Sequence, residues 1–145
     1  MGLFDRILIA TDGSDASLKA ARLAVTLAAR DGAQLLVAHV IDDEVVKELA
    51  RALAKTDNQA RQAMSDNAQK YVAEVEKLAQ QNSVPARGVV DHGTPHETIL
   101  KLADKEKVDL LVMGKTGRRG LRRALAGSVT RRVIDLAEIP VLVVK

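Results

Sequence analysis

Short apolar runs alternate with longer amphipathic stretches along most of the chain. The first run, Arg6–Ala10, ends at Thr11-Asp12-Gly13-Ser14, and this predicts a buried strand that leads into a loop. From Ser14, a suitable N-cap, apolar residues recur at helical spacing until Gly32. The same criteria predict further strands, separated by helical stretches, at Leu35–Ile41, Pro85–Val90, Asp109–Met113 and Pro140–Val144.

The helical stretches differ in how clearly they are marked. Residues 42–81 are compatible with helix but lose their apolar pattern near Lys55-Thr56-Asp57-Asn58, which predicts a break or a mobile loop there. Gly93-Thr94-Pro95 opens a helix, because proline is favoured in the first helical turn. A last helix is predicted over 128–137. The strand at Pro85–Val90 is less apolar than the others, so we expect it near a sheet edge.

Strands that alternate with helices predict an α/β protein, here a single doubly wound, Rossmann-like domain spanning residues 1–145. We expect a five-stranded parallel sheet of order 3-2-1-4-5, with helices on both faces and right-handed crossovers. In such folds, ligands bind beyond the carboxyl ends of the strands, where the strand order reverses. This switch point lies between strands 1 and 4, where the loops 11–14 and 114–128 meet.

Composition removes several classes of function. The chain has no cysteine, which excludes disulfides, zinc–thiolate sites and cysteine nucleophiles. Phe4 and Tyr71 are its only Phe, Tyr or Trp residues, so we do not expect a site that stacks nucleic-acid bases. No apolar run approaches the ~18 residues needed to span a bilayer, and the N-terminus has no signal-peptide pattern. We therefore expect a cytoplasmic protein.

The most distinctive segment follows the fourth predicted strand, from Gly114 to Thr130. Its glycines allow tight turns and a close approach of the backbone to a ligand. Gly127-Ser128 leads into a helix, whose first N–H groups and positive dipole end attract phosphate. The hydroxyls of Ser128 and Thr130 add donors, and the charged side chains between residues 114 and 134 are all Lys or Arg. The segment therefore predicts a polyphosphate site.

Familiar phosphate-binding motifs are missing from this segment. The chain has neither a Walker P-loop, G-x-x-x-x-G-K-[ST], nor a G-x-G-x-x-G sequence after the first strand. Taken alone, Gly114 and Gly117 fit an ordinary turn equally well. Together with Gly127 and Ser128, they form the pattern G-x2-G-x9-G-[ST] at the switch point. In this pattern the chain resembles the ATP-binding branch of the universal stress protein family.

The resemblance covers essentially the whole chain. It includes the segments 7–14 and 139–144, His39-Val40 at the end of strand 2, and Gly93-Thr94-Pro95. It implies a nucleotide-responsive regulator of the stress response whose ligand is ATP, without distinguishing ATP from ADP or AMP. It also implies a homodimer that pairs through strand 5. A Mg²⁺ ion that bridges the phosphates is compatible with this reading, because such an ion needs few protein ligands.

The resemblance further implies which residues hold the nucleotide. Asp12 would hydrogen-bond adenine or ribose, Val40 would contact adenine through its backbone, and the start of the last helix would hold the phosphates. The predicted nucleotide-binding residues are Thr11, Asp12, Val40, Met113, Gly114, Lys115, Thr116, Gly117, Gly127, Ser128, Val129 and Thr130. Many relatives have Ser-His after the first glycine, where this chain has Lys115-Thr116, so the role of Lys115 stays open.

Plainer interpretations of these residues stay open as well. Asp12-Gly13 is a strong turn dipeptide, and Ser128 fits an N-cap as well as a phosphate donor. The basic run from Lys115 to Arg132, which includes three Arg pairs, is compatible with nucleic acid but lacks interleaved aromatic residues. We therefore do not expect a nucleic-acid partner.

The sequence predicts neither a catalytic residue nor a metal site. His39, His92 and His96 lie near the ends of strands 2 and 3, but their spacing fits no metal motif. The glycine loop offers no carboxylate to position water for ATP hydrolysis, which leaves Asp12 as the nearby candidate. The alternatives to a nucleotide-binding regulator are a slow ATPase or autokinase and a nucleotide-free basic interaction module.

Overall fold

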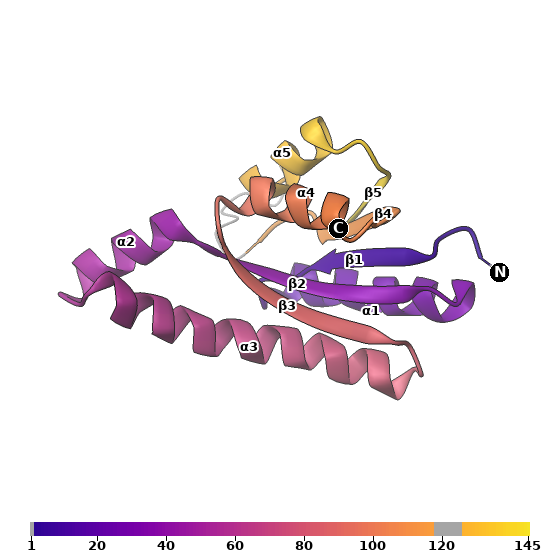
Figure 1. Cartoon of the computed structure of the whole chain (residues 1–145), viewed down its shortest axis with the longest axis horizontal. Helices are drawn as coiled ribbons and strands as arrows, with labels where there is room; N and C mark the ends of the chain where they lie inside the picture. The colour runs from indigo at the N-terminus through magenta and orange to yellow at the C-terminus, as the bar shows by residue number, and fades with distance from the viewer. Residues whose placement is uncertain (1, 118–125) are drawn as a thin grey trace.

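The structure, a computed structural model, describes residues 2–117 and 126–145, and its strands and helices alternate along the chain (Figure 1). The strands are β1 (Arg6–Ala10), β2 (Gln34–Asp42), β3 (Ala86–Gly93), β4 (Leu110–Gly114) and β5 (Val141–Val144). The helices are α1 (Asp15–Asp31), α2 (Asp43–Ala52), α3 (Asp57–Gln81), α4 (Pro95–Lys105) and α5 (Ser128–Leu136). All the strand pairings are parallel and the order is β3-β2-β1-β4-β5, which confirms the predicted fold class.

Each face of the sheet is covered by a pair of helices (Figure 1). Ile7 and Ile9 of β1 pack with buried residues of α1 and α3, whereas Leu8 between them packs with α4 and α5. This follows from the strand geometry, because successive side chains point to opposite faces. A parallel sheet covered on both sides requires strands that are apolar throughout, as the sequence of β4 shows.

The loops at the helix ends agree with the sequence signals. The Ser14 side chain accepts a hydrogen bond from the Ser17 N–H and caps α1, as predicted, and Gly32 ends that helix in the left-handed conformation. The predicted break within 42–81 is confirmed, since α2 ends at Ala52 and Thr56 begins α3 with a capping box. The two helices form a hairpin, of which α2 and the start of α3 project past the sheet (Figure 1).

The hairpin has a small apolar core of its own. It contains Ile41 from the end of β2 and the alanines and valine on the facing sides of the helices: Val46, Ala50, Ala60 and Ala68. Val90 of β3 packs against this core, and β3 is an edge strand, as its weaker apolar pattern predicted. The hairpin is therefore attached to the sheet beside the carboxyl ends of β2 and β3.

The segment before β1 is tied to the far end of α1. The carboxylate of Asp31 accepts a hydrogen bond from the Phe4 N–H at 3.0 Å and contacts Arg30 at 3.2 Å. The hydrogen bond from Phe4 is the main reason why the pKa of Asp31 lies below its ordinary value. None of the helices in the described parts of the chain is both long enough and apolar enough to cross a membrane.

Candidate functional site

A hollow of about 370 Å³ opens at the carboxyl ends of the central strands. It lies where β1 and β4 are neighbours and their chains leave in opposite directions, which is the switch point of the sheet. Every residue that the sequence predicted for the nucleotide lines this hollow, except Lys115. The loops after β1 and β4 and the start of α5 are therefore brought together. The basic residues Arg118, Arg119, Arg122 and Arg123 lie outside the described residues.

The N-terminus of α5 forms one wall of the hollow. Gly127 is the N-cap, with no side-chain cap, and Ser128 is the first helical residue. The interpretation of Ser128 as the N-cap was therefore wrong by one position. Because the first intrahelical hydrogen bond runs from the Arg131 N–H to the Gly127 carbonyl, the N–H groups of residues 128–130 have no acceptor within the helix. They and the helix dipole make this wall attractive to an anion.

Thr130 has a different role from the one expected for its hydroxyl. The residue is only 4% exposed, and its Oγ1 donates a hydrogen bond to the Gly114 carbonyl at 3.0 Å. Since a hydroxyl has one proton, this hydrogen bond leaves none for a phosphate. The Thr130 side chain instead fastens the end of β4 to α5, and its backbone N–H is among the N–H groups at the start of α5 that have no acceptor within the helix.

The backbone of Lys115 makes two hydrogen bonds that join neighbouring elements. Its N–H donates to the Val144 carbonyl at 2.8 Å, and its carbonyl accepts from the Gly127 N–H at 2.8 Å. These two hydrogen bonds extend the pairing of β4 with β5 and attach the loop to the start of α5. The structure thus gives a fixed backbone position to the residue whose role the sequence left open.

The three glycines of the signature stand in different surroundings. A Cβ at Gly114 would lie 2.8 Å from the carbonyl carbon of Ala16, in the first turn of α1. A Cβ at Gly117 would lie 2.5 Å from Oδ2 of Asp12, whereas one at Gly127 would approach none of the described atoms closer than 3.6 Å. Gly114 therefore allows two backbones to pack, and Gly117 allows the loop to pass beside the Asp12 carboxylate.

Asp12 combines the turn role and the ligand-facing position. Its Oδ1 accepts a hydrogen bond from the Ser14 N–H at 2.9 Å, which closes a turn of the Asx type. The same side chain lines the hollow opposite Gly117. Beneath it, the hydroxyls of Thr11 and Ser17 are 3.3 Å apart, and both residues are buried. The loop after β1 is thus held in one shape by its own polar side chains.

The opposite wall comes from residues that the sequence did not point to. Asp42 at the end of β2 and Val45 in the first turn of α2 line this wall, and α3 contributes Met64, Asn67 and Tyr71. His39 also lines this wall. The sequence marked His39 only as a residue before Val40 and as one of three histidines near strand ends. The His39 ring contacts the ring of Tyr71 on α3, which is 32 positions later in the chain, and no local sequence signal predicts such a contact.

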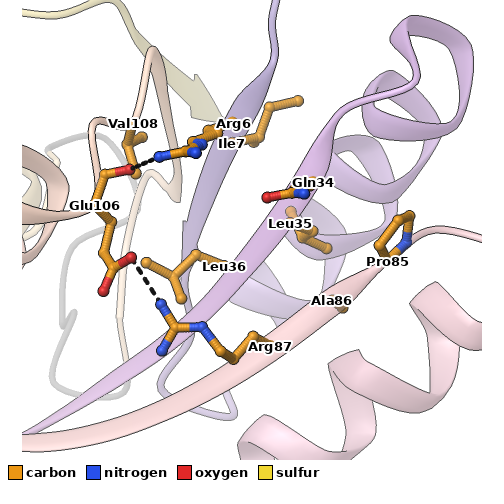
Figure 2. A pocket seen from close by; sticks show the side chains of 10 residues that line it. All are labelled: Arg6, Ile7, Gln34, Leu35, Leu36, Pro85, Ala86, Arg87, Glu106 and Val108. Carbon is orange, nitrogen blue, oxygen red and sulfur yellow. Dashed lines mark hydrogen bonds and ion pairs between the residues drawn. The ribbon is translucent and has the colours of Figure 1, made fainter.

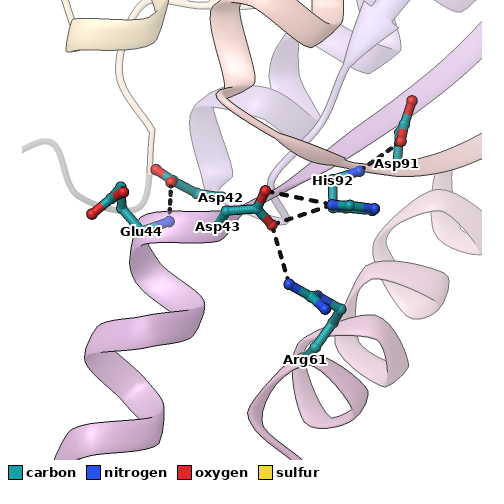
Figure 3. A network of polar contacts seen from close by, with 6 residues as sticks. All are labelled: Asp42, Asp43, Glu44, Arg61, Asp91 and His92. Atoms are coloured by element: carbon teal, nitrogen blue, oxygen red, sulfur yellow. Dashed lines mark hydrogen bonds and ion pairs between the residues drawn. The ribbon is translucent and has the colours of Figure 1, made fainter. Parts of the chain in front are cut away.

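His39 and His92 contact different partners. The Nδ1 atom of His39 lies 2.6 Å from the Thr11 carbonyl oxygen. The Nδ1 of His92, at the end of β3, lies 3.3 Å from Asp43, which also contacts Arg61 of α3 at 3.5 Å (Figure 3). In the described parts of the chain, His, Asp and Glu side chains form no group of three that could hold a metal ion.

A second hollow, of about 300 Å³, lies at the other end of the sheet, beside the amino ends of β1, β2 and β3 (Figure 2). Its two guanidinium groups both turn to one residue. Arg87 forms an ion pair with the Glu106 carboxylate at 2.8 Å, and Arg6 donates to the Glu106 carbonyl at 3.0 Å. Both guanidinium groups of this hollow thus have partners within the chain, and the switch-point hollow is the better candidate for a ligand site.

Comparison with known proteins agrees with this geometry. The model of the universal stress protein family matches residues 3–145. The chain belongs to the universal stress protein family. Universal stress protein MJ0531 of Methanocaldococcus jannaschii is 37% identical over 99% of this chain and 83% of that protein. Other members of the family have been solved as structures.

Two of these structures bear on the site. The structure of MJ0577, also a universal stress protein of Methanocaldococcus jannaschii, has a TM-score of 0.86 and 29% identity, and covers 99% of this chain and 96% of that chain. A universal stress protein solved in complex with cAMP has a TM-score of 0.71 and 25% identity, and covers 97% of this chain and 96% of that chain. Adenine-nucleotide binding thus occurs in a relative of the same fold.

Proposed function

We propose that this chain binds ATP, or a closely related adenine nucleotide, in the switch-point hollow. One observation carries the proposal: the uncapped N-terminal turn of α5 opens into the same hollow as Asp12 and Gly117. A helix N-terminus and a carboxylate that line one hollow suit the two ends of a nucleotide, because phosphate binds N–H donors and adenine or ribose offers hydrogen-bond donors. The relative solved with cAMP supports the same ligand class.

The nucleotide would lie with its phosphates at α5 and its adenosine toward β1 and β2. The N–H groups of Ser128, Val129 and Thr130 would bind phosphate oxygens, and the Ser128 hydroxyl would add a donor. Asp12 and the backbone of Val40 would contact the adenosine. A volume of about 370 Å³ falls within the ordinary range of small-molecule sites, about 300–1,000 Å³. A Mg²⁺ ion would bridge the phosphates with few protein ligands.

We infer that nucleotide binding regulates the protein and that the nucleotide is not rapidly hydrolysed. Phosphoryl transfer needs a group that positions the attacking water or hydroxyl. In the described part of the chain, the carboxylates that line the hollow are Asp12 and Asp42. Asp12 accepts the Ser14 N–H, and Asp42 accepts the Glu44 N–H as the cap of α2. Both are engaged in holding local backbone, which favours a binding protein over a slow ATPase or autokinase.

Saturating ATP is expected to raise the melting temperature of the purified protein. At a free ATP concentration of 100 times Kd, the free energy of unfolding rises by about 2.7 kcal/mol. For a chain of this size that corresponds to an increase in Tm of about 5–11 °C. Differential scanning fluorimetry with ATP, ADP, AMP and GTP, each with and without Mg²⁺, measures the effect and ranks the ligands.

The release of nucleotide on denaturation provides an independent check. Protein purified without added nucleotide is denatured, and the supernatant is analysed by chromatography. Absence of adenine nucleotide, together with no rise in Tm at millimolar ATP, would favour the nucleotide-free interaction module instead. Sustained phosphate release that disappears in Asp12→Ala would favour the enzyme.

We also propose that two copies pair through β5. This strand is at the open edge of the sheet, its residues are half-buried, and Ile134 and Leu136 of the neighbouring α5 are 48% and 56% exposed. The carbonyls of Pro140 and Val144 face β4, where they accept from Leu111 and Lys115. By the alternation of a parallel ladder, Val141 and Val143 direct their N–H and carbonyl groups to the open edge, ready for a second copy.

Val143→Pro is expected to convert the dimer to a monomer of 15.6 kDa while the fold is retained. The proline removes an outward N–H and leaves the hydrogen bonds to β4 in place. Light scattering coupled to size exclusion gives the mass, and circular dichroism monitors the fold. A wild-type chain that is monomeric at micromolar concentration, or a folded Val143→Pro that remains dimeric, would be inconsistent with pairing through β5.

A further inference from the structure

The pairing of β1 with β2 continues past the end of its backbone ladder through a side chain. The last Cα partners are Ala10 and Ala38, and the Thr11 N–H donates to the Ala38 carbonyl at 2.9 Å. The Thr11 carbonyl is then met by the imidazole of His39, with Nδ1 2.6 Å from the oxygen. Since a carbonyl oxygen only accepts, the Nδ1 of His39 carries the proton. The side chain thus fixes the peptide that leads directly into Asp12.

The His39 ring is itself positioned by α3. Its centroid is 5.5 Å from that of Tyr71, and the two rings meet edge to face at 67°. Tyr71 lies between the buried residues Ala68 and Val72 on α3, which pack on the hairpin core and on the main core. A continuous set of contacts therefore runs from α3 through Tyr71 and His39 to Thr11.

Polar contacts fix the first half of α3 as well. Asp43, at the start of α2, contacts both Arg61 of α3 and His92 at the end of β3 (Figure 3). Arg61 and Asp43 are only partly exposed, at 40% and 38% of their side chains. The hairpin of α2 and α3 is thus linked to the β3 edge on one side and to His39 on the other. These contacts hold the start of α3 to α2 and, through Asp43, to β3.

We infer that His39 is a positioning residue for the nucleotide: it holds the Thr11 carbonyl so that the Asp12 carboxylate faces the ligand, and Tyr71 holds His39. The inference rests on the proposed nucleotide site. Thr11 is 5% exposed, so its carbonyl has little access to water as a replacement partner. Without the imidazole, the peptide between Thr11 and Asp12 is held less firmly, by the hydrogen bond of the Asp12 N–H to Ser17 Oγ at 3.4 Å, and Asp12 spends less time in the binding orientation. This lowers affinity in proportion to the population that is lost.

Three substitutions at His39 separate this role from simple packing. His39→Asn keeps an amide N–H near the position of Nδ1, His39→Gln moves the amide one bond outward, and His39→Leu removes the donor. We expect His39→Leu and His39→Gln to weaken ATP binding about tenfold, and His39→Asn to remain within about threefold of wild type. Isothermal titration calorimetry gives Kd. His96→Asn, at a histidine outside the hollow, is the matched control.

A double-substitution cycle tests the part of Tyr71. If Tyr71 acts through His39, then Tyr71→Leu weakens ATP binding in the wild-type background and has no further effect in His39→Leu. Additive effects would mean that Tyr71 contacts the nucleotide directly, and would overturn the coupling to α3. Nitrogen NMR of the ligand-free protein shows which ring nitrogen of His39 carries the proton, and for a neutral ring we expect Nδ1.

The failures of the two proposals are distinguishable. Equal ATP affinity in wild type and His39→Leu, or a His39→Asn variant no better than His39→Leu, overturns the positioning role while the nucleotide site stands. A proton on Nε2 of a neutral His39 overturns it too, even where His39→Leu fails to fold. A wild-type protein that binds no nucleotide overturns the proposed function instead.

Discussion

Gly114→Ala is expected to lower the free energy of unfolding by about 3 kcal/mol and Tm by about 6–12 °C. The new Cβ would lie 2.8 Å from the carbonyl carbon of Ala16 and 3.0 Å from both the Ala16 oxygen and the Ser17 nitrogen. These atoms belong to the first turn of α1, so no side chain can rotate to make room. Relief requires β4 and α1 to separate, and β4 is buried along its whole length. Urea and thermal unfolding followed by circular dichroism measure the loss.

Gly127→Ser is the matched control for this experiment. A Cβ at Gly127 would lie 3.6 Å from the nearest atom of the described residues, and serine is at least as good an N-cap as glycine. We expect its stability to lie within about 0.5 kcal/mol of wild type. A Gly114→Ala protein as stable as Gly127→Ser would show that β4 and α1 are not in the close contact described above.

These glycines illustrate where prediction from the sequence ends. The pattern of Gly114, Gly117 and Gly127 located the loop correctly, because close backbone approach and a helix start both leave a mark in the local sequence. It could not distinguish the roles of the three glycines, because each depends on what lies opposite: the backbone of α1 for Gly114, the Asp12 carboxylate for Gly117, and loop backbone at ordinary contact distance for Gly127. For Gly114 and Gly117, that information is held by residues about a hundred positions away in the chain.

The fold itself was almost fully readable. Apolar runs predicted each strand to within a few residues, and the polar break near Thr56 located the turn between α2 and α3. The strand order followed from general rules of α/β folds, and the positions of loops 11–14 and 114–117 followed from the strand order. Regular periodicity is a property of short segments, so the strands and helices can be predicted without any knowledge of tertiary contacts.

Side-chain partners were less predictable. The Thr130 hydroxyl was expected at a phosphate, but it donates to the Gly114 carbonyl, because burial requires a nearby acceptor once α5 packs on β4. The wall formed by His39 and Tyr71 was not anticipated either, since it depends on the angle at which α3 crosses β2. The sequence thus predicted the backbone segments that line the hollow better than the side chains that hold them in place.

Gly117→Val is expected to reduce ATP affinity about 100-fold, or about 2.7 kcal/mol, while the ligand-free protein keeps a Tm within about 3 °C of wild type. The described atoms that a Cβ would meet within 4 Å both belong to the Asp12 side chain: Oδ2 at 2.5 Å and Cγ at 3.7 Å. The fold therefore tolerates the larger residue by moving one carboxylate. That movement displaces Asp12 from the ligand, and the isopropyl group fills part of the hollow. Calorimetric titration with ATP measures the loss.

The smaller Gly117→Ala variant separates these two causes. Its single methyl group displaces Asp12 but occupies little of the hollow, so we expect an intermediate loss of affinity of about tenfold. In an Asp12→Ala background the carboxylate is already absent, and Gly117→Ala should then cost nothing further. If the two substitutions weaken ATP binding additively, Gly117 contacts the nucleotide directly rather than through Asp12. If neither changes affinity, the phosphate end of the ligand does not lie between the glycine loop and the start of α5.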